Sequence, residues 1–246
     1  MTAFGIDIGG SGIKGAPVDL STGSLAADRA RVPTPDPSTP PAVLEAVQQL
    51  VDADESNGAV GITIPSVVVS GVVRTASNID KAWVSLDARR MFSESLARPV
   101  TVLNDADAAG VAEARFGAGK DVKGVVLLLT FGTGIGSALL VDGVLVPNTE
   151  LGHLEFKGDI AEGYAAGRLV KRESKSIEWW ARRVDELLTY IELLLSPNRI
   201  IIGGGISKRF EEFVGFLHTD AELVPAGLRN NAGIVGAAMA AEEDAS

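Results

Sequence analysis

Two glycine-rich turns, each following a short apolar strand, constrain the fold of this chain more than any other feature of its sequence. The first turn, Gly9-Gly10-Ser11-Gly12, follows the apolar run 4–8, and the second, Gly132-Thr133-Gly134-Ile135-Gly136, follows the apolar run 125–130. After each turn the chain alternates again as a strand, so each motif predicts a hairpin and not a strand that enters a helix. The same pattern in both halves is a weak internal repeat, which predicts two α/β lobes with a cleft between them.

The other segments alternate helices and strands, as expected for an α/β protein. The prolines of 32–41 indicate an extended loop, and Pro41 suits the first turn of a helix with an apolar stripe. The patterns predict further strands at 59–64, 67–74, 100–103, 137–141, 144–147 and 199–202. They predict further helices at 86–96, 106–118 and 177–195, another from about Lys208, and a last one at about 234–244. A boundary near 103–107 separates an N-terminal lobe, 1–104, from a C-terminal lobe, 105–246.

Composition and charge exclude several classes of protein and of site. The 246 residues include no Cys and only two His, His153 and His218, which excludes disulfides, cysteine-bound zinc and a multi-histidine metal site. With 22 Lys and Arg against 32 Asp and Glu, the formal charge of -10 argues against broad binding of nucleic acid. The apolar runs are too short to cross a bilayer, and the first residues lack a signal-peptide pattern. We therefore expect a cytoplasmic protein that binds neither nucleic acid nor membranes.

Both glycine-rich turns are suited to binding phosphate. Closely spaced glycines expose backbone N–H groups and let phosphate oxygens approach without a Cβ in the way. Residues 10–15 also fit G-x-G-x-x-G, but a dinucleotide site would need a helix directly after the turn. Two such turns facing each other could hold a polyphosphate chain, although two purely structural hairpins would show the same pattern.

Two charged residues flank the first turn. Asp7 interrupts an apolar strand just before it, and its carboxylate would either accept N–H bonds from the turn or hold Mg²⁺ through water near the phosphates. Lys14 follows the turn, where it could contact a phosphate or remain a solvated strand residue.

Polar residues that could bind a sugar occur at two places. Asn104 and Asp105 lie where a buried strand meets a helix, so they could cap the helix, or one carboxylate could accept a proton from a substrate hydroxyl. Glu150 and His153 flank Gly152, and such side chains hydrogen-bond sugar hydroxyls. A lone histidine is more often structural, so that alternative stays open.

Taken in order, these motifs resemble those of the sugar kinases of the repressor, open-reading-frame and kinase (ROK) family, which have the two-lobed actin-like ATPase (ribonuclease H-like) fold. Residues 5–15 and 129–136 resemble that family's first and second phosphate motifs. Asn104-Asp105 is similar to the connecting motif whose Asp is the base, and Glu150-Leu151-Gly152-His153 is similar to the E-x-G-H sugar motif.

The resemblance extends into the last third of the chain. Residues 202–206 resemble the segment that borders the adenosine site. Residues 233–238 resemble the final helix, which in that family packs back on the N-terminal lobe. The match therefore spans almost the whole sequence.

The resemblance implies a role for each matching residue. It implies that the hexose is bound by Asn78, Asn104, Asp105, Glu150, His153 and Glu162, with Asp105 as the catalytic base for the 6-hydroxyl. It implies that the donor is bound by Asp7, Gly9, Gly10, Ser11, Gly12, Lys14, Thr130, Gly132, Thr133, Gly134, Gly136, Gly204 and Gly205. Asp7 would hold Mg²⁺ through water, and no zinc is expected, because the cysteine-rich zinc motif of most relatives is missing.

The missing cysteines, together with 72–80 and 204–209, resemble the actinobacterial polyphosphate glucokinases and polyphosphate glucomannokinases. The implied activity is phosphoryl transfer from inorganic polyphosphate, and also from ATP, to glucose or mannose, by a homodimer. A strictly ATP-dependent hexokinase, an N-acetylmannosamine kinase and a non-catalytic actin-like nucleotide switch are the alternatives. The sequence shows no N-terminal helix-turn-helix, so we do not expect a transcriptional repressor.

A run of basic residues could guide a polyanion despite the negative net charge. Four of them, which we call the basic track, are Arg168, Lys171, Arg172 and Lys175, and Arg182 and Arg183 follow. The alternative is a solvated helix face balanced by Glu173 and Glu178. The adjacent Trp179 and Trp180 would belong either to a dimer interface or to the core.

Overall fold

The structure is a computed structural model that describes residues 2–54, 56, 58–77 and 79–245, and it divides into two compact units. Unit 1 comprises Met1–Ala112 and Asn231–Ser246, and unit 2 comprises Glu113–Asn230. The division therefore falls within helix α3 (Asp105–Phe116), later than the predicted boundary at residue 104. The physical reason is packing within unit 1, because a Cβ at Gly236 would overlap the carbonyl oxygen of Ala108.

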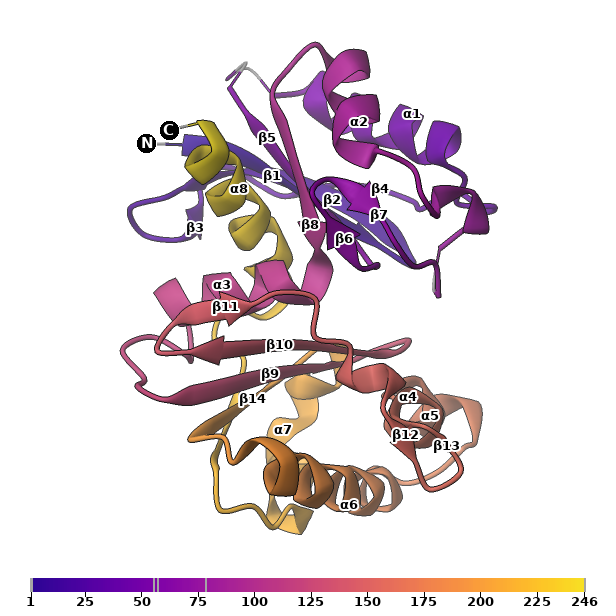
Figure 1. The fold of residues 1–246 in the computed structure, drawn as a ribbon, viewed down its shortest axis with the longest axis vertical. Helices are drawn as coiled ribbons and strands as arrows, with labels where there is room; N and C mark the ends of the chain where they lie inside the picture. The colour runs from indigo at the N-terminus through magenta and orange to yellow at the C-terminus, as the bar shows by residue number, and fades with distance from the viewer. Residues whose placement is uncertain (1, 55, 57, 78, 246) are drawn as a thin grey trace. The chain divides into compact units, whose positions relative to one another are not determined.

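The central feature of unit 1 is a mixed sheet with the strand order β3-β2-β1-β5-β8, in which β4 also pairs with β2 (Figure 1). Strands β1 and β2 form the predicted antiparallel hairpin, and β5 and β8 run parallel to β1. The strands span Thr2–Gly9 (β1), Gly12–Asp19 (β2), Ser24–Leu25 (β3), Ala30–Val32 (β4), Val60–Ile64 (β5) and Val100–Asn104 (β8). A small hairpin, Val68–Val69 (β6) and Val72–Val73 (β7), forms a separate sheet.

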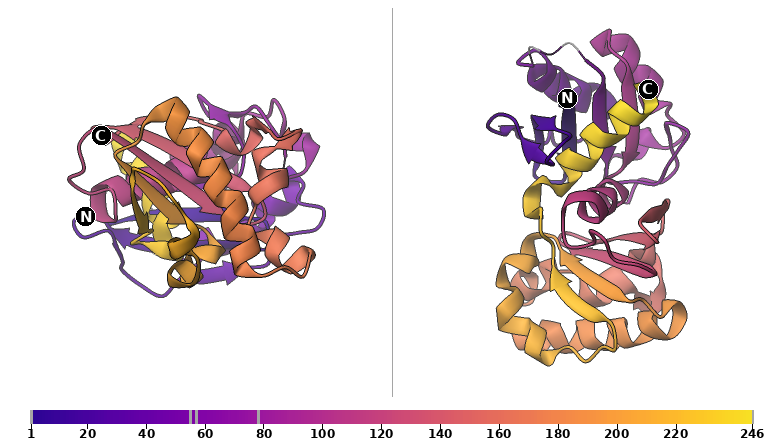
Figure 2. Two further views of the ribbon diagram at one scale, coloured as in Figure 1. Left: turned by 90° about the horizontal axis from the view of Figure 1, so that it is seen from below. Right: turned by 90° about the vertical axis from the view of Figure 1, so that its left-hand side faces the viewer.

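The alternation of side chains along β1 divides unit 1 into layers. Phe4, Ile6 and Ile8 are buried in one core with apolar residues of α1 (Pro40–Val51) and α2 (Ala88–Leu96). The intervening Gly5 points to the other face, where a Cβ would overlap the carbonyl oxygen of Ile234 in α8 (Ala232–Ala245). Figure 2 shows α8, in yellow, lying across this face of the sheet. Small residues on both surfaces allow this close packing.

Unit 2 contains a second sheet with the strand order β11-β10-β9-β14-β15, covered by the long helix α6 (Ile177–Leu195) (Figure 1). Its strands span Val125–Phe131 (β9), Ile135–Val141 (β10), Val144–Val146 (β11), Arg199–Gly203 (β14) and Glu222–Pro225 (β15). Trp180 of α6 is fully buried and makes edge-to-face contacts with Phe131 and Phe213. Trp180 therefore belongs to the core and not to an interface, whereas Trp179 is half-buried.

Some short elements differ from the sequence prediction. The helix predicted from about Lys208 is present but short: α7 (Phe210–Phe213) is a single α-helical turn between two 3₁₀ turns, Gly205–Arg209 and Val214–Phe216. Glycines at 204, 205 and 215 lower the helix propensity there. The short elements β12 (Glu155–Phe156), β13 (Asp159–Ile160), α4 (Ala161–Ala165) and α5 (Arg168–Arg172) were not predicted. Among the described residues, no helix combines the length and apolar character needed to span a membrane.

Candidate active site

The first glycine-rich turn borders a hollow in unit 1. Gly9 and Gly12 pair across the hairpin, which leaves Gly10 and Ser11 exposed at its tip. A pocket of about 290 Å³ lies beside the turn, and it is lined by Ile8, Gly9, Gly10, Thr34, Pro35, Asp36, Ser38, Pro65 and Ile79. Sequence reasoning missed Thr34, Asp36 and Ser38, although these polar residues between prolines were the available signal.

Asp7 and Lys14 lie together next to this turn. Lys14 Nζ donates to Oδ2 of Asp7 at 3.2 Å, and the hydroxyl of Thr63 donates to Oδ1 at 3.1 Å. Asp7 pairs with Lys14 on one side and with Thr63 on the other in the sheet register, so the three side chains form a row on the face covered by α8. The carboxylate therefore bonds to neighbouring strands.

Asp7 is a carboxylate that could hold Mg²⁺ through water. The described residues contain no group of three or more His, Asp or Glu side chains that could enclose a metal ion. Magnesium in phosphoryl-transfer sites is usually held by one or two carboxylates together with substrate phosphates and water. A single half-buried carboxylate beside a phosphate-type turn is compatible with that kind of site.

Asn104 and Asp105 have different local roles at the start of α3. Asn104 Oδ1 accepts the N–H groups of Ala106 at 2.8 Å and Asp107 at 3.0 Å, and its Nδ2 donates to the carbonyl oxygen of Ser66 at 3.1 Å. Asn104 is thus a buried helix cap. Asp105 accepts the N–H of Ala106 through Oδ1 at 2.9 Å and is only half-buried. Asn104 therefore caps the helix in which Asp105 is the first residue.

The second glycine-rich turn lies against the turn that follows β14. Gly132 donates its N–H to the carbonyl oxygen of Gly134 at 3.0 Å, which closes the turn between β9 and β10. Gly204 has φ = +77°, and a Cβ there would lie 2.5 Å from the carbonyl oxygen of Phe131. Glycine is therefore required at 204 both for backbone conformation and for space. The structure thus places Gly204 against Phe131, the residue directly before the second glycine-rich turn.

Glu150 and His153 form a pair in unit 2. His153 Nδ1 lies 3.2 Å from Oε2 of Glu150. Burial raises the pKa of the Glu150 carboxyl above its ordinary value; the nearby His153 opposes this shift and the charge of Glu162 adds to it. The three predicted hexose-binding residues of this unit therefore lie within electrostatic reach of one another.

Ile135, the first residue of β10, connects these acidic residues to the second turn. Its N–H donates to Oε2 of Glu162 at 3.3 Å, and Glu162 is 9% exposed. A Cβ at Gly152 would overlap the carbonyl oxygen of Ile135, so the glycine of the E-x-G-H motif allows this close approach. The N–H of Ile135 thus contacts Glu162, and its carbonyl group contacts the E-x-G-H motif, both of which are predicted to bind sugar.

Three residues of α6 hold the short helix α4, which carries Glu162. Trp180 Nε1 donates to the carbonyl oxygen of Ala165 at 2.8 Å, and Arg183 Nε donates to that of Tyr164 at 2.5 Å. The Tyr164 hydroxyl donates to Glu186 at 2.6 Å. The bonds from Trp180 and Arg183 satisfy carbonyl groups at the end of α4 that have no partner within the helix. Sequence reasoning did not identify this function of α6.

The basic track begins directly at the second turn. The Arg168 N–H donates to the carbonyl oxygen of Gly132 at 2.9 Å, and Lys171, Arg172 and Lys175 are exposed beyond it. Arg172 pairs with Glu173 at 3.0 Å, so one member of the track is partly neutralised. Arg182 and Arg183 are engaged elsewhere, since Arg182 pairs with Glu178 and Arg183 holds α4.

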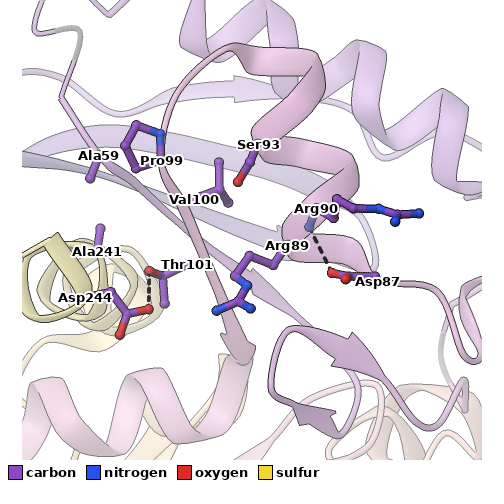
Figure 3. Close-up of a pocket in the computed structure, with 10 residues that line it drawn as sticks. All are labelled: Ala59, Asp87, Arg89, Arg90, Ser93, Pro99, Val100, Thr101, Ala241 and Asp244. Atoms are coloured by element: carbon purple, nitrogen blue, oxygen red, sulfur yellow. Dashed lines mark hydrogen bonds between the residues drawn. The ribbon is translucent and has the colours of Figure 1, made fainter.

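The predicted sugar-binding residue Asn78 lies outside the described residues. A second pocket of about 580 Å³ lies between α2, the start of β8 and the end of α8 (Figure 3). Arg89 points into it, and Thr101 donates to Asp244 at 2.7 Å (Figure 3). None of the predicted site residues lines this pocket.

Comparisons with known proteins agree with the motifs. The ROK family model matches residues 3–168. The polyphosphate glucokinase of Mycobacterium tuberculosis (strain H37Rv) is 50% identical over 242 residues, which cover 98% of this chain and 91% of the relative. The crystal structure of the inorganic polyphosphate/ATP-glucomannokinase from Arthrobacter sp. strain KM is similar with a TM-score of 0.96 and 48% identity, over 99% of both chains.

A more distant solved structure is similar over its full length. The ROK family glucokinase from Streptomyces griseus, in complex with glucose and AMPPNP, has a TM-score of 0.82 and 25% identity, over 99% of this chain and 100% of that one. These comparisons confirm the predicted α/β fold of the actin-like ATPase type. The chain belongs to the ROK family.

Proposed function

We propose that this protein is a hexose kinase that transfers a phosphoryl group from inorganic polyphosphate, and also from ATP, to the 6-hydroxyl of glucose. Support comes from the relatives named as polyphosphate glucokinases and as a polyphosphate/ATP-glucomannokinase. Mannose is a second acceptor in this proposal, since the Arthrobacter protein is named a glucomannokinase. The observation that carries the proposal is that this likeness covers 98% of the chain at 50% identity.

In this proposal the hexose is bound by hydrogen bonds to Asn78, Asn104, Asp105, Glu150, His153 and Glu162. The half-buried carboxylate of Asp105 accepts the proton of the 6-hydroxyl as its oxygen attacks the terminal phosphorus. The Asn104 cap supports this role by holding the start of α3. A single positioned base contributes roughly 10²- to 10⁴-fold to such a reaction.

The donor phosphates are bound in this proposal by the backbone N–H groups of the two glycine-rich turns. Mg²⁺, when bound with the donor, neutralises charge on the transferring phosphoryl group. Asp7 would hold it through water, while Lys14 stays beside that carboxylate. Thr130, Gly136 and Gly205 belong to the backbone around the second turn.

The basic track, Arg168, Lys171, Arg172 and Lys175, is proposed to contact polyphosphate beyond the reacting end. Its support is the direct bond between Arg168 N–H and Gly132, which starts the track at a donor-binding turn. A track of positive charges suits a long polyanion. ATP ends at its γ-phosphate and would therefore not extend along the track in this way.

We also propose that the active form is a homodimer. Support comes from exposed apolar side chains in unit 2, in particular Val144 on the outer strand β11 and Leu193 near the end of α6, which are 71% and 79% exposed. Sedimentation at several protein concentrations tests the oligomeric state. A cytoplasmic location stays a prediction.

A coupled assay tests the proposed activity. Purified protein is given glucose or mannose with either ATP or polyphosphate, and hexose 6-phosphate formation is followed through glucose-6-phosphate dehydrogenase, after phosphomannose isomerase and phosphoglucose isomerase for mannose. Product from both donors supports the proposal, and product from ATP alone supports a strictly ATP-dependent hexokinase. N-Acetylmannosamine as the only acceptor, or hydrolysis of ATP without any sugar product, would overturn it.

A further inference from the structure

Two carbonyl groups of the first glycine-rich turn accept hydrogen bonds from side chains of the segment that follows β3. Arg31 Nη2 donates to the carbonyl oxygen of Ser11 at 2.6 Å, and the Thr34 hydroxyl donates to that of Gly9 at 2.5 Å. A carbonyl oxygen carries partial negative charge and repels phosphate, whereas an N–H group attracts it. The donors at 31 and 34 therefore make the turn a better anion site.

The position of Arg31 is set by the sheet. Strand β4 pairs with β2 so that Arg31 lies opposite Lys14, which in turn lies opposite Asp7. The three residues extend one row across strands β1, β2 and β4, with side chains on the same face. The guanidinium then lies over Gly12, where a Cβ would be 2.8 Å from Cζ of Arg31. Glycine at 12 thus leaves space for the arginine as well as for phosphate.

The two cations of this row differ in what they offer an anion. Lys14 is already paired with the carboxylate of Asp7 at 3.2 Å. Arg31 is exposed and uses one Nη group on a neutral carbonyl, and among the described residues no carboxylate forms an ion pair with it. A guanidinium has five N–H donors, so several remain for phosphate oxygens.

From this geometry we infer that Arg31 is a donor-binding residue, whose guanidinium contacts phosphate groups of polyphosphate at the first glycine-rich turn. The inference rests on the proposed function and adds a residue that none of the family motifs includes. It also gives the loop after β4 a role in donor binding, because Thr34 and Arg31 cover the same turn from one segment.

The test compares Arg31→Met, Arg31→Lys and the matched control Arg90→Met. Arg90 is an exposed arginine of α2 in the same unit, and it forms a surface ion pair with Glu94 at 3.9 Å. Two measurements are made: calorimetric binding of inorganic tripolyphosphate without hexose, and KM for polyphosphate and for glucose. The thermal unfolding midpoint of each variant is recorded as a check of folding.

We expect Arg31→Met to weaken tripolyphosphate binding and to raise the KM for polyphosphate about tenfold, with the glucose KM unchanged. Arg31→Lys should recover part of the loss, because the charge remains but the paired N–H donors do not. Arg90→Met should match the wild type. Equal donor binding by Arg31→Met and wild type, or a parallel change in the glucose KM, would overturn the inference. Failure of the wild type to bind tripolyphosphate would instead contradict the proposed donor.

Discussion

His153 Nδ1 lies 3.2 Å from Oε2 of Glu150, so the two polar residues of the E-x-G-H motif form a pair. The pair lies in an environment that disfavours the charge of Glu150, because burial raises its pKa while His153 only partly offsets that effect. An ionised carboxylate accepts hydrogen bonds from sugar hydroxyls through both oxygens and more strongly than a neutral carboxyl does. Stability and hexose binding therefore place opposite demands on this residue.

The first prediction concerns the pH dependence of Glu150→Gln. Because the folded state holds the Glu150 proton more tightly than the unfolded state does, ionisation of this carboxyl costs stability. The cost is absent below the ordinary value of 4.5 and is complete once the pH has risen through the raised pKa. Urea unfolding at several pH values should show Glu150→Gln gaining stability over wild type as the pH rises. Glu155→Gln, an exposed neighbour, should show no such trend.

The same titration should appear in wild-type kinetics. As the pH falls through the raised pKa of Glu150, the carboxyl becomes neutral and the glucose KM should rise. In Glu150→Gln the KM should be high at every pH. A wild-type KM that stays constant across this range would contradict a hexose-binding role for Glu150.

Asp105→Asn should remove the proposed base while keeping its shape. We expect kcat to fall roughly 10²- to 10⁴-fold with little change in the glucose KM or the unfolding midpoint. Asp87→Asn is a useful contrast, because Asp87 caps α2 by accepting the N–H of Arg90 at 2.9 Å. Because Asn caps a helix about as well as Asp, that variant should change stability by less than about 0.5 kcal/mol and keep its kcat. Retention of more than about a tenth of kcat by Asp105→Asn would exclude Asp105 as the base.

The basic track predicts a dependence on the length of the donor. In the double variant Lys171→Met/Lys175→Met, the KM for long-chain polyphosphate should rise about tenfold, while the values for tripolyphosphate and ATP change less than about twofold. Lys120→Met/Lys123→Met, which removes the same charge from exposed residues of unit 2, should leave all three values unchanged. Equal losses on all donors would show that the track makes no length-specific contact.

Arg183→Met should loosen α4 and thereby move Glu162. The variant loses the hydrogen bond from Arg183 to the carbonyl oxygen of Tyr164. It also loses the stacking of the guanidinium on the rings of Tyr164 and Trp179, whose centroids lie 3.8 and 4.6 Å from Cζ. Both losses should raise the glucose KM several-fold. Hydrogen exchange of the Ile135 amide, which donates to Glu162, should become faster. Arg182→Met is the matched control, because this arginine bonds to Glu178 and lies over the Phe216 ring. Unchanged exchange at Ile135 in Arg183→Met would refute this coupling.

Gly61→Ala tests the close packing of α8 on the sheet of unit 1. A Cβ at this position would overlap the carbonyl oxygen of Ala237, so the helix must shift, at a cost of about 1–3 kcal/mol or more. Gly215→Ala meets no atom within 4 Å and should change stability by less than about 0.5 kcal/mol. Denaturant unfolding measures both, and equal stabilities would contradict the tight contact.

Local patterns in the sequence predicted much of the fold. Glycine spacing and strand alternation predicted the two hairpins whose first strands end at Gly9 and Phe131. Apolar periodicity predicted α6 with its observed bounds. Such features follow from the conformational freedom of glycine and from side-chain period, which act within a few residues. The short elements α4 and α5 escaped prediction because five residues are too few to show a period.

The sequence by itself therefore determined the strands, the turns and the residue types that can bind phosphate and sugar. Tertiary structure decided which residues meet. The register of β4 on β2 places Arg31 over the first turn, and the packing of α6 on α4 brings Glu162 to Ile135. These contacts join segments that are remote along the chain, and no local periodicity encodes them, because they arise only when sheets and helices pack at a single register.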